Sequence, residues 1–289
     1  MAKSPAHKFG QIIGELLEST VRPQLEAFCQ SQVLYLDHQK KTRPARRGKK
    51  VSWADGYGNT HDLDFVIERG GTDQTKGSPV AFIETAWRRY TKHSRNKAQE
   101  IQGAILPLAE RFRWNNPFLG AVLAGFFTEG SLEQLRSLGF TVLYFPYESL
   151  VAAFRSEGID VAFAEDTPDA IFKKTTKRIV NTRLEVLDKI RASLVAANKK
   201  SIDDFFNALK KRLGRRVTRV VILPLYGKAN EFPSIEDAVA FIDRHQPHEG
   251  STDFRKYEIR VEFSNSDKVE ALLEAKEKVR EFLEFVARQ

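Results

Sequence analysis

The chain opens with apolar residues at helical spacing. Residues 8 to 30 place an apolar side chain at every third or fourth position, which predicts an amphipathic helix with a bend at Pro23. The pattern changes to a two-residue period at residues 61–67, which predicts a strand. Because successive side chains of a strand point to opposite faces, we expect Leu63 and Phe65 in a core and Asp64 on the other face.

A second strand is predicted at residues 80–84, where an apolar run ends at Glu84. Residues 69–79 are rich in turn formers and predict the loop of a hairpin. A helix is expected to begin near its N-cap Ser94. The apolar run 117–127, the helical segment 131–138 and the apolar run 140–145 then predict a βαβ unit with parallel strands. This order predicts an α/β fold with a mixed sheet flanked by helices.

The rest of the chain predicts two further regions. Residues 166–213 are charged, carry helical apolar spacing and predict a helical connector. Residues 214–289 predict a small α+β domain with strands at 216–226 and 256–263 and helices at 234–244 and 268–287. We therefore expect three regions, at residues 1–165, 166–213 and 214–289.

Composition excludes several classes of protein. The 289 residues are 42% hydrophobic and contain no apolar run of about 18 residues, which predicts a soluble globular protein without a membrane span. The opening residues lack an apolar signal core, and the single Cys29 cannot form an internal disulfide, so we expect a reducing, cytoplasmic setting. The sequence lacks the phosphate-binding loop, zinc-binding helix and serine elbow motifs, which argues against ATPases, zinc enzymes and serine hydrolases.

Positive charge is concentrated in two segments. The net charge of +8 favours polyanionic partners. Residues 40–50 carry seven cations in eleven positions, and we expect a flexible arm that contacts nucleic acid through Arg43, Arg46, Arg47, Lys49 and Lys50. Residues 87–97 interleave aromatic and basic side chains, a phosphate-binding composition that includes Arg88, Arg89, His93 and Arg95. For both segments the alternative is a solvated charged surface.

Asp64 and Glu84 are the candidate catalytic acids. Two carboxylates on neighbouring strands repel each other unless a cation lies between them, and oxygen ligands of this kind suit Mg²⁺. The arrangement resembles the PD-(D/E)XK nuclease superfamily, the fold of many restriction endonucleases. The resemblance covers about residues 9 to 165 and implies that Asp64 and Glu84 are metal ligands.

The resemblance departs from the family pattern at one position. Family members carry a lysine two residues after the glutamate, and this chain has Ala86 there. We expect Lys92 or Lys97 to supply the missing cation, ahead of Arg88, whose guanidinium stays protonated and cannot act as a base. The family also implies an acid from the first helix. Glu15 is the preferred third metal ligand over Glu18, and an ordinary surface glutamate is the alternative reading.

These residues lead to one functional hypothesis and two alternatives. The chain is expected to be a Mg²⁺-dependent DNA endonuclease of the restriction, anti-phage type. Cutting both strands favours a homodimer by symmetry, and the need for a companion DNA methyltransferase stays open. The first alternative is a catalytically inactive DNA-binding or scaffolding protein on a decayed nuclease fold, with Ala86 marking the lost activity. The second is an RNA-directed nuclease.

Overall fold

The computed structural model describes residues 4–46, 48–91, 94–225, 227–246 and 256–288. These residues divide into two compact units, one of residues 1–112 and 117–209 and the other of residues 113–116 and 210–289. Each unit has its own sheet and its own apolar core. No helix in the described part of the chain is long and apolar enough to cross a membrane.

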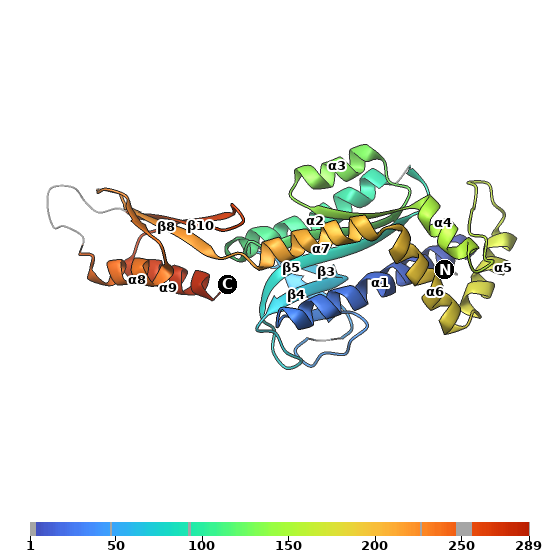
Figure 1. Ribbon diagram of the computed structural model, residues 1–289, viewed down its shortest axis with the longest axis horizontal. Coiled ribbons are helices and arrows are strands. Elements are labelled where there is room, and N and C mark those ends of the chain that lie inside the picture. The colour runs from blue at the N-terminus through green and yellow to red at the C-terminus, as the bar shows by residue number, and fades with distance from the viewer. Residues whose placement is uncertain (1–3, 47, 92–93, 226, 247–255, 289) are drawn as a thin grey trace. The chain divides into compact units, whose positions relative to one another are not determined.

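The first unit contains a five-stranded mixed sheet with the strand order β1-β4-β5-β6-β7 (Figure 1). Its strands are β1 (Tyr35–His38), β4 (Phe65–Arg69), β5 (Ser78–Arg88), β6 (Phe118–Gly125) and β7 (Thr141–Pro146). The pairs β1/β4 and β4/β5 are antiparallel, whereas β5/β6 and β6/β7 are parallel. The parallel pairs are possible because helices intervene between their strands. The predicted α/β class with a mixed sheet flanked by helices is therefore confirmed.

Helices cover both faces of this sheet. They are α1 (Pro5–Ser31), α2 (Ser94–Arg111), α3 (Glu129–Ser137), α4 (Tyr147–Arg155), α5 (Asp169–Val180), α6 (Leu184–Ala197) and α7 (Lys199–Leu213). A short 3-10 turn, η2 (Arg113–Asn115), lies between α2 and β6. Strand β6 illustrates the two faces, because Phe118 packs edge-on against Phe205 of α7 whereas Leu123 belongs to the core under α2 and α3.

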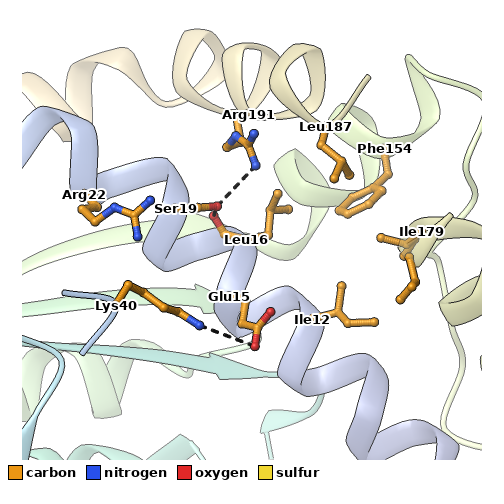
Figure 2. A pocket seen from close by; sticks show the side chains of 11 residues that line it. Ile12, Glu15, Leu16, Ser19, Arg22, Lys40, Phe154, Ile179, Leu187 and Arg191 are labelled. Carbon is orange, nitrogen blue, oxygen red and sulfur yellow. Dashed lines mark hydrogen bonds and ion pairs between the residues drawn. The ribbon is translucent and has the colours of Figure 1, made fainter. Parts of the chain in front are cut away.

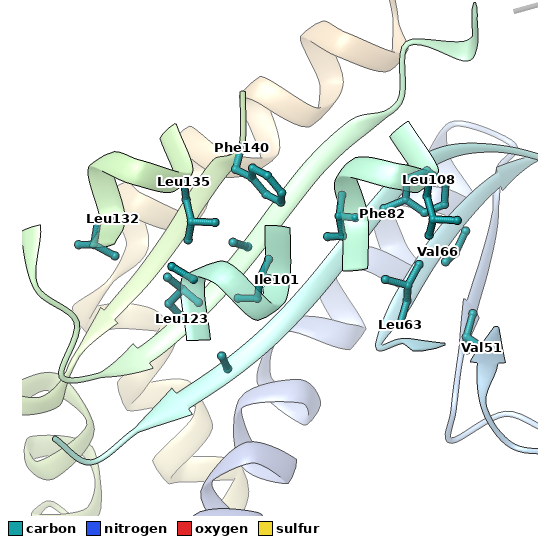
Figure 3. Packing of buried hydrophobic residues seen from close by; sticks show 14 of the residues in the cluster. Val51, Leu63, Val66, Phe82, Ile101, Leu108, Leu123, Leu132, Leu135 and Phe140 are labelled. Carbon is teal, nitrogen blue, oxygen red and sulfur yellow. The ribbon is translucent and has the colours of Figure 1, made fainter. Parts of the chain in front are cut away.

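The core under α2 and α3 joins the sheet to a hairpin, β2 (Val51–Ala54) and β3 (Thr60–Leu63) (Figure 3). Phe82 of β5 and Ile101 of α2 are both fully buried in it. The hairpin contributes Val51, Trp53 and Leu63, so its inner face is anchored in the same core. Burying such side chains stabilises the fold by about 1.5–3 kcal/mol each. This anchoring determines where the chain enters β4.

Asp64 lies at a break between two strands. The sequence predicted one strand over residues 61–67, but β3 ends at Leu63 and β4 begins at Phe65. The reason is that the two strands have different partners: β3 pairs with β2, whereas β4 pairs with β1 and β5. The chain passes from the hairpin to the main sheet at Asp64. Because Asp64 belongs to neither strand, the direction of its side chain is not set by the alternation of side chains between the two faces of a strand.

Glu84 lies inside a strand and not at its end, contrary to the prediction. Strand β5 continues to Arg88, because residues 84–88 pair with the parallel strand β6. The antiparallel register with β4 stops at the pair Phe65 and Ile83, one residue before Glu84. From Glu84 onward, β5 has therefore lost its β4 neighbour while it keeps β6.

The second unit is a four-stranded antiparallel sheet with two helices. Its elements are β8 (Val217–Pro224), β9 (Asn230–Phe232), α8 (Ile235–Arg244), β10 (Tyr257–Phe263), β11 (Lys268–Leu273) and α9 (Lys276–Ala287), in the strand order β11-β10-β8-β9. The prediction of one long helix over residues 268–287 is wrong, because residues 268–273 form β11 and pair with β10. Val269 and Ala271 are buried while their neighbours are exposed, which is the two-residue period of a strand.

The region predicted as a helical connector is not a separate body. Helices α5 and α6, and α7 up to residue 209, belong to the first unit, and α5 packs on α1. Phe172 of α5 contacts Phe9 of α1, with ring centroids 5.9 Å apart. The second unit begins at residue 210, close to the predicted boundary at residue 214.

Candidate active site

Two acidic side chains meet where β5 loses its antiparallel neighbour. The main-chain N–H of Asp64 donates to a carboxylate oxygen of Glu84 at 3.2 Å. The carboxylate of Asp64 accepts hydrogen bonds from the main-chain N–H of Thr85 at 2.8 Å and from its hydroxyl at 2.7 Å. The Thr85 N–H is available because β4 no longer pairs with β5 at this position. The end of the β4/β5 ladder thus brings Asp64 and Glu84 together.

The other oxygen of Asp64 is also held in place. The amide of Gln39, in the turn after β1, donates to it at 2.9 Å. Asp64 therefore accepts three hydrogen bonds from two residues, so its orientation is fixed before any ligand binds. Thr85 and Gln39 are site residues that the sequence analysis missed. Thr85 directly follows Glu84, but its role depends on the strand register, which no local pattern reports.

The third acid near the site is Glu18 of α1 and not Glu15. Burial, followed by the charge of Asp64, raises the pKa of Glu18 to about 7. Glu15 points to a more exposed place, where its carboxylate lies 3.7 Å from the ammonium of Lys40 and is 65% exposed. Helical spacing alone favoured Glu15, but Glu18 is the glutamate of α1 whose pKa is raised by the charge of Asp64 and whose own charge raises the pKa of Glu84.

Glu84 has the most strongly perturbed acidity of the group. Burial raises its pKa well above the ordinary value, and the charges of Asp64 and Glu18 raise it further. The charge of Lys97 and the Asp64 N–H act in the opposite direction and lower it. Crowded, partly buried carboxylates of this kind are frequent at functional sites.

Lys97 is the described cation that acts on Glu84. It lies in the first turn of α2, where its ammonium is 3.1 Å from Glu100 and its side chain is 22% exposed. Glu84 shares a strand face with Ala86, and Ala86 and Ala98 are buried in the same apolar cluster. Lys97, the residue before Ala98, therefore lies on the same side of the sheet as Glu84. Lys92, the other candidate, lies outside the described residues.

The remaining cations of residues 88–97 are arranged differently. Arg88 lies 3.7 Å from Glu100 and donates to the carbonyl of Trp87. Arg89 stacks over the rings of Tyr90 and Phe172. Arg95 is exposed on α2, and His93 lies outside the described residues. Of these four predicted phosphate contacts, Arg95 is the described residue most open to a polyanion.

The predicted basic arm is largely tied down. Arg43 is buried, and its guanidinium donates to Asp37 at 2.8 Å and to the two oxygens of Glu68 at 2.5 and 2.9 Å. Arg46 donates to Asp37 and to three main-chain carbonyls. The expectation that Arg43 contacts nucleic acid does not hold, because its side chain has no exposed surface. Arg46 is likewise engaged internally.

The other residues of this arm remain at the surface. Lys50 is 74% exposed and pairs with Asp62 at 2.5 Å. Lys49 is exposed, and Arg47 lies outside the described residues. Lys49 and Lys50 flank the base of the β2/β3 hairpin, whose tip carries Tyr57 at 93% exposure. The hairpin thus keeps part of the positive surface that the composition predicted.

The residues present can be tested against a metal ion. In the described part of the chain, no three His, Cys, Asp or Glu side chains are grouped as a ready ligand cage. A Zn²⁺ site would need such a cage, whereas Mg²⁺ usually keeps several waters and binds one or two carboxylates together with substrate phosphates. Asp64 and Glu84 supply two such carboxylates. The site therefore fits an open Mg²⁺ position and does not fit a closed structural metal site.

Comparisons with known proteins add little to this description. No family model matches the chain, and no curated protein matches it. A crystal structure described as "Protein of Unknown Function AF1548" aligns with 14% identity over 69% of this chain and 99% of that chain. Its TM-score is 0.30, which carries no argument about fold or function.

Proposed function

We propose that the protein is a Mg²⁺-dependent nuclease that hydrolyses phosphodiester bonds of DNA. One observation carries the proposal: where β4 stops pairing with β5, the main-chain N–H of Asp64 donates to the Glu84 carboxylate, and the charge of Asp64 raises the pKa of both Glu84 and Glu18. Such crowding disfavours three negative charges unless cations bind. The positive net charge and the exposed Lys49, Lys50 and Arg95 support a polyanionic substrate.

The residues have distinct roles in this proposal. Asp64 and Glu84 hold the metal ion, and Thr85 and Gln39 orient Asp64. A bound Mg²⁺ supplies charge neutralisation and lowers the pKa of a coordinated water. Lys97 provides a positive charge beside Glu84, where it stabilises the charge that develops on the phosphate. The water oxygen loses a proton to the solvent and bonds to phosphorus, the ester P–O bond breaks, and the leaving oxygen takes up a proton from the solvent.

A restriction-type role is the finer form of the proposal. It rests on the resemblance of residues 9–165 to the PD-(D/E)XK nucleases, with Asp64 and Glu84 in the positions of the family acids. Cutting of both strands would involve two copies of the site, which favours a homodimer. A companion DNA methyltransferase would then protect the host DNA.

A second candidate function has its own supporting observation. Ala86, the position at which the family carries lysine, is 6% exposed and packs in the apolar core. A site that has lost its lysine to core packing fits a DNA-binding or scaffolding protein without catalysis. Whether Lys97 compensates for this loss decides between the two functions.

The deciding experiment is a cleavage assay with matched acidic variants. The purified protein is incubated with a mixture of phage and plasmid DNA, with Mg²⁺ or with EDTA. We expect Mg²⁺-dependent cutting by the wild type and by Asp62→Asn, whose carboxylate is exposed and pairs with Lys50. We expect cutting at background level for Asp64→Asn and Glu84→Gln, with mobility shifts on DNA retained.

Two results would count against the proposal. Unchanged cutting by both Asp64→Asn and Glu84→Gln would eliminate this site. DNA binding without cutting by the wild type, across substrates of diverse sequence, would favour the noncatalytic function. A parallel arm with RNA tests for an RNA-directed nuclease.

A further inference from the structure

The first unit contains a pocket of about 350 Å³ beside α1 (Figure 2). Its walls come from α1, α4, α5, α6 and the turn after β1. The volume lies at the lower end of the range of about 300–1,000 Å³ that is usual for small-molecule sites. It therefore suits a ligand of the size of one nucleotide.

The pocket has an apolar side and a cationic side. Figure 2 shows Ile12, Phe154, Ile179 and Leu187 gathered on one side, and Arg22, Lys40 and Arg191 spread along the other near Ser19. A ligand that fills both sides has an apolar body and a negatively charged group. This combination of apolar walls with a few placed polar groups is typical of small-molecule sites.

The three cations pair with carboxylates at the surface, and Arg191 in addition donates to the Ser19 hydroxyl at 3.5 Å. Each pairs with a carboxylate that is at least half exposed: Lys40 with Glu15 at 3.7 Å, Arg22 with Glu26 at 3.6 Å, and Arg191 with Asp188. Exposed pairs of this kind contribute about 0–1 kcal/mol, so an incoming anion can displace them. The pocket can thus bind a phosphate without first breaking a strong contact.

The pocket and the carboxylate site are linked through two pairs of consecutive residues, Glu18 with Ser19 and Gln39 with Lys40. Ser19 and Glu18 are neighbours on α1, and the charge of Lys40 lowers the pKa of Glu18 against the effect of burial. Gln39, which precedes Lys40, donates to Asp64. A strand with a phosphate at Asp64 and Glu84 can therefore extend along α1 to the pocket.

We propose that the pocket binds one nucleotide unit of the DNA strand next to the bond that is cut. This inference rests on the proposed function. The base packs against the apolar side, and its phosphate is held by Arg22, Lys40 and Arg191. The Glu15 carboxylate, released from Lys40 when that ammonium binds the phosphate, can accept from the edge of a base, which a purely hydrocarbon ligand would leave unused. The Ser19 hydroxyl donates to the Leu16 carbonyl and accepts from Arg191, so it holds Arg191 at the pocket.

The proposal implies that the bound nucleotide is unstacked. A base in this pocket is removed from its neighbours in the strand, which costs a few kcal/mol in a paired duplex and less in a single strand or at a mismatch. The enzyme is thus expected to prefer single-stranded, mismatched or easily opened sites. Glu15, expected at first to bind metal, acts here as part of the wall that recognises the base.

The test measures the fluorescence of DNA oligonucleotides that carry 2-aminopurine. Every protein in the assay carries Glu84→Gln, called the background protein, and the buffer contains EDTA, so that no cleavage is required. Emission of 2-aminopurine rises when the base leaves the stack. We expect a rise on binding for the background protein and for the added control Lys189→Gln, an exposed position of α6 outside the pocket. We expect Arg191→Gln and Leu187→Glu to remove the rise and to weaken binding at least tenfold.

Three results would overturn the assignment. The first is an absent rise in the background protein, or a rise that persists in both pocket variants when their melting curves match the control. The second is saturable binding of free deoxyadenosine monophosphate without any oligonucleotide signal, which would assign the pocket to a free nucleotide. The third is binding of dodecyl phosphate with no nucleotide binding, which would assign it to an alkyl anion. Because the assay needs no cleavage, an inactive wild type would refute the nuclease proposal while the pocket result stands separately.

Discussion

The main-chain N–H of Asp64 donates a 3.2 Å hydrogen bond to the carboxylate of Glu84, a residue 20 positions further along the chain. The bond exists because β4 stops pairing with β5 one residue before Glu84. Two acids are thereby fixed to one another through the backbone and not only through a shared ligand. The end of the β4/β5 ladder therefore determines how the two acids lie relative to each other.

Thr85→Val tests whether the orientation of Asp64 matters for metal binding. The variant loses the 2.7 Å hydroxyl bond to Asp64 and keeps the shape of the side chain. Residues that orient a metal ligand typically contribute about 10- to 100-fold in metal affinity. We expect the Mg²⁺ concentration for half-maximal cleavage to rise by that factor, and Thr85→Ser to behave like the wild type. Equal Mg²⁺ dependence of both variants would contradict this role.

Lys97→Gln tests whether α2 replaces the missing strand lysine. A positioned cation or proton donor contributes roughly 10²–10⁴-fold to rate, so we expect the cleavage rate to fall by that factor with DNA affinity nearly unchanged. Arg95→Gln, two residues away and exposed, should weaken binding in a salt-dependent way with little effect on the maximal rate. A wild-type cleavage rate for Lys97→Gln would contradict the proposed role of Lys97 and would favour Lys92.

A lysine placed two residues after Glu84 provides a further check on the proposed role of Lys97. Ala86 and Ala98 share one apolar cluster, so a lysine at position 86 lies on the strand face of Glu84 and next to the start of α2. We expect Ala86→Lys to recover part of the cleavage rate in the Lys97→Gln background. The measurement is the single-turnover rate of the double variant against that of Lys97→Gln alone. If the double variant folds and its cleavage rate does not rise, a lysine at position 86 cannot take the role proposed for Lys97.

Glu18→Gln tests the pH dependence that the crowded acids impose. The pKa of Glu18 is raised from 4.5 to about 7, so the folded state favours its protonated form. The stability gained from this group is complete below about pH 4.5 and is lost as the pH rises through about 7. Without divalent metal, we expect Glu18→Gln to melt a few degrees above the wild type at pH 8 and level with it at pH 4.

The pH result has its own control in Glu15→Gln. Glu15 is 65% exposed, and its charge raises the pKa of Glu18 less than burial and Asp64 do, so its replacement should change the difference between pH 4 and pH 8 far less than Glu18→Gln does. Addition of Mg²⁺ at pH 8 should raise the melting temperature of the wild type because bound metal offsets the repulsion of the carboxylates. If Glu18→Gln raises the melting temperature equally at pH 4 and at pH 8, the assignment of the pH dependence to Glu18 is refuted.

Arg43→Ala tests the buried ion cluster that replaced the expected DNA-binding arm. Arg43, Asp37 and Glu68 have no exposed side-chain surface. Removing the arginine leaves the buried Glu68 without its ionic partner, whereas Asp37 keeps Arg46, and loss of one member of a buried pair costs about 3–5 kcal/mol. We expect that loss in the free energy of unfolding, measured by urea denaturation. Lys49→Ala, at the surface, should stay within about 0.5 kcal/mol of the wild type. Wild-type stability of Arg43→Ala would contradict the structural role.

The sequence predicted helices and strands well where one spacing of apolar residues continued over a long stretch of the chain. The first helix, expected at residues 8–30, is α1 from Pro5 to Ser31, and Cys29 on it is buried, with its pKa raised to about 12 by burial. Prediction failed at residues 268–273, because Val269, Leu272 and Leu273 also fit a helical stripe. Pairing with β10 decided that conflict in favour of a strand.

By itself, the sequence determined the types of group available to the protein: two acids beside apolar strands, two segments rich in Lys and Arg, and an alanine two residues after Glu84. Only the tertiary structure decided which of them meet. It placed Asp64 at the crossing between two sheets, chose Glu18 over Glu15, buried Arg43 and directed Lys97 toward Glu84. The physical reason is that side-chain periodicity is a local property, whereas these encounters depend on strand register and on helix packing between residues far apart in the chain.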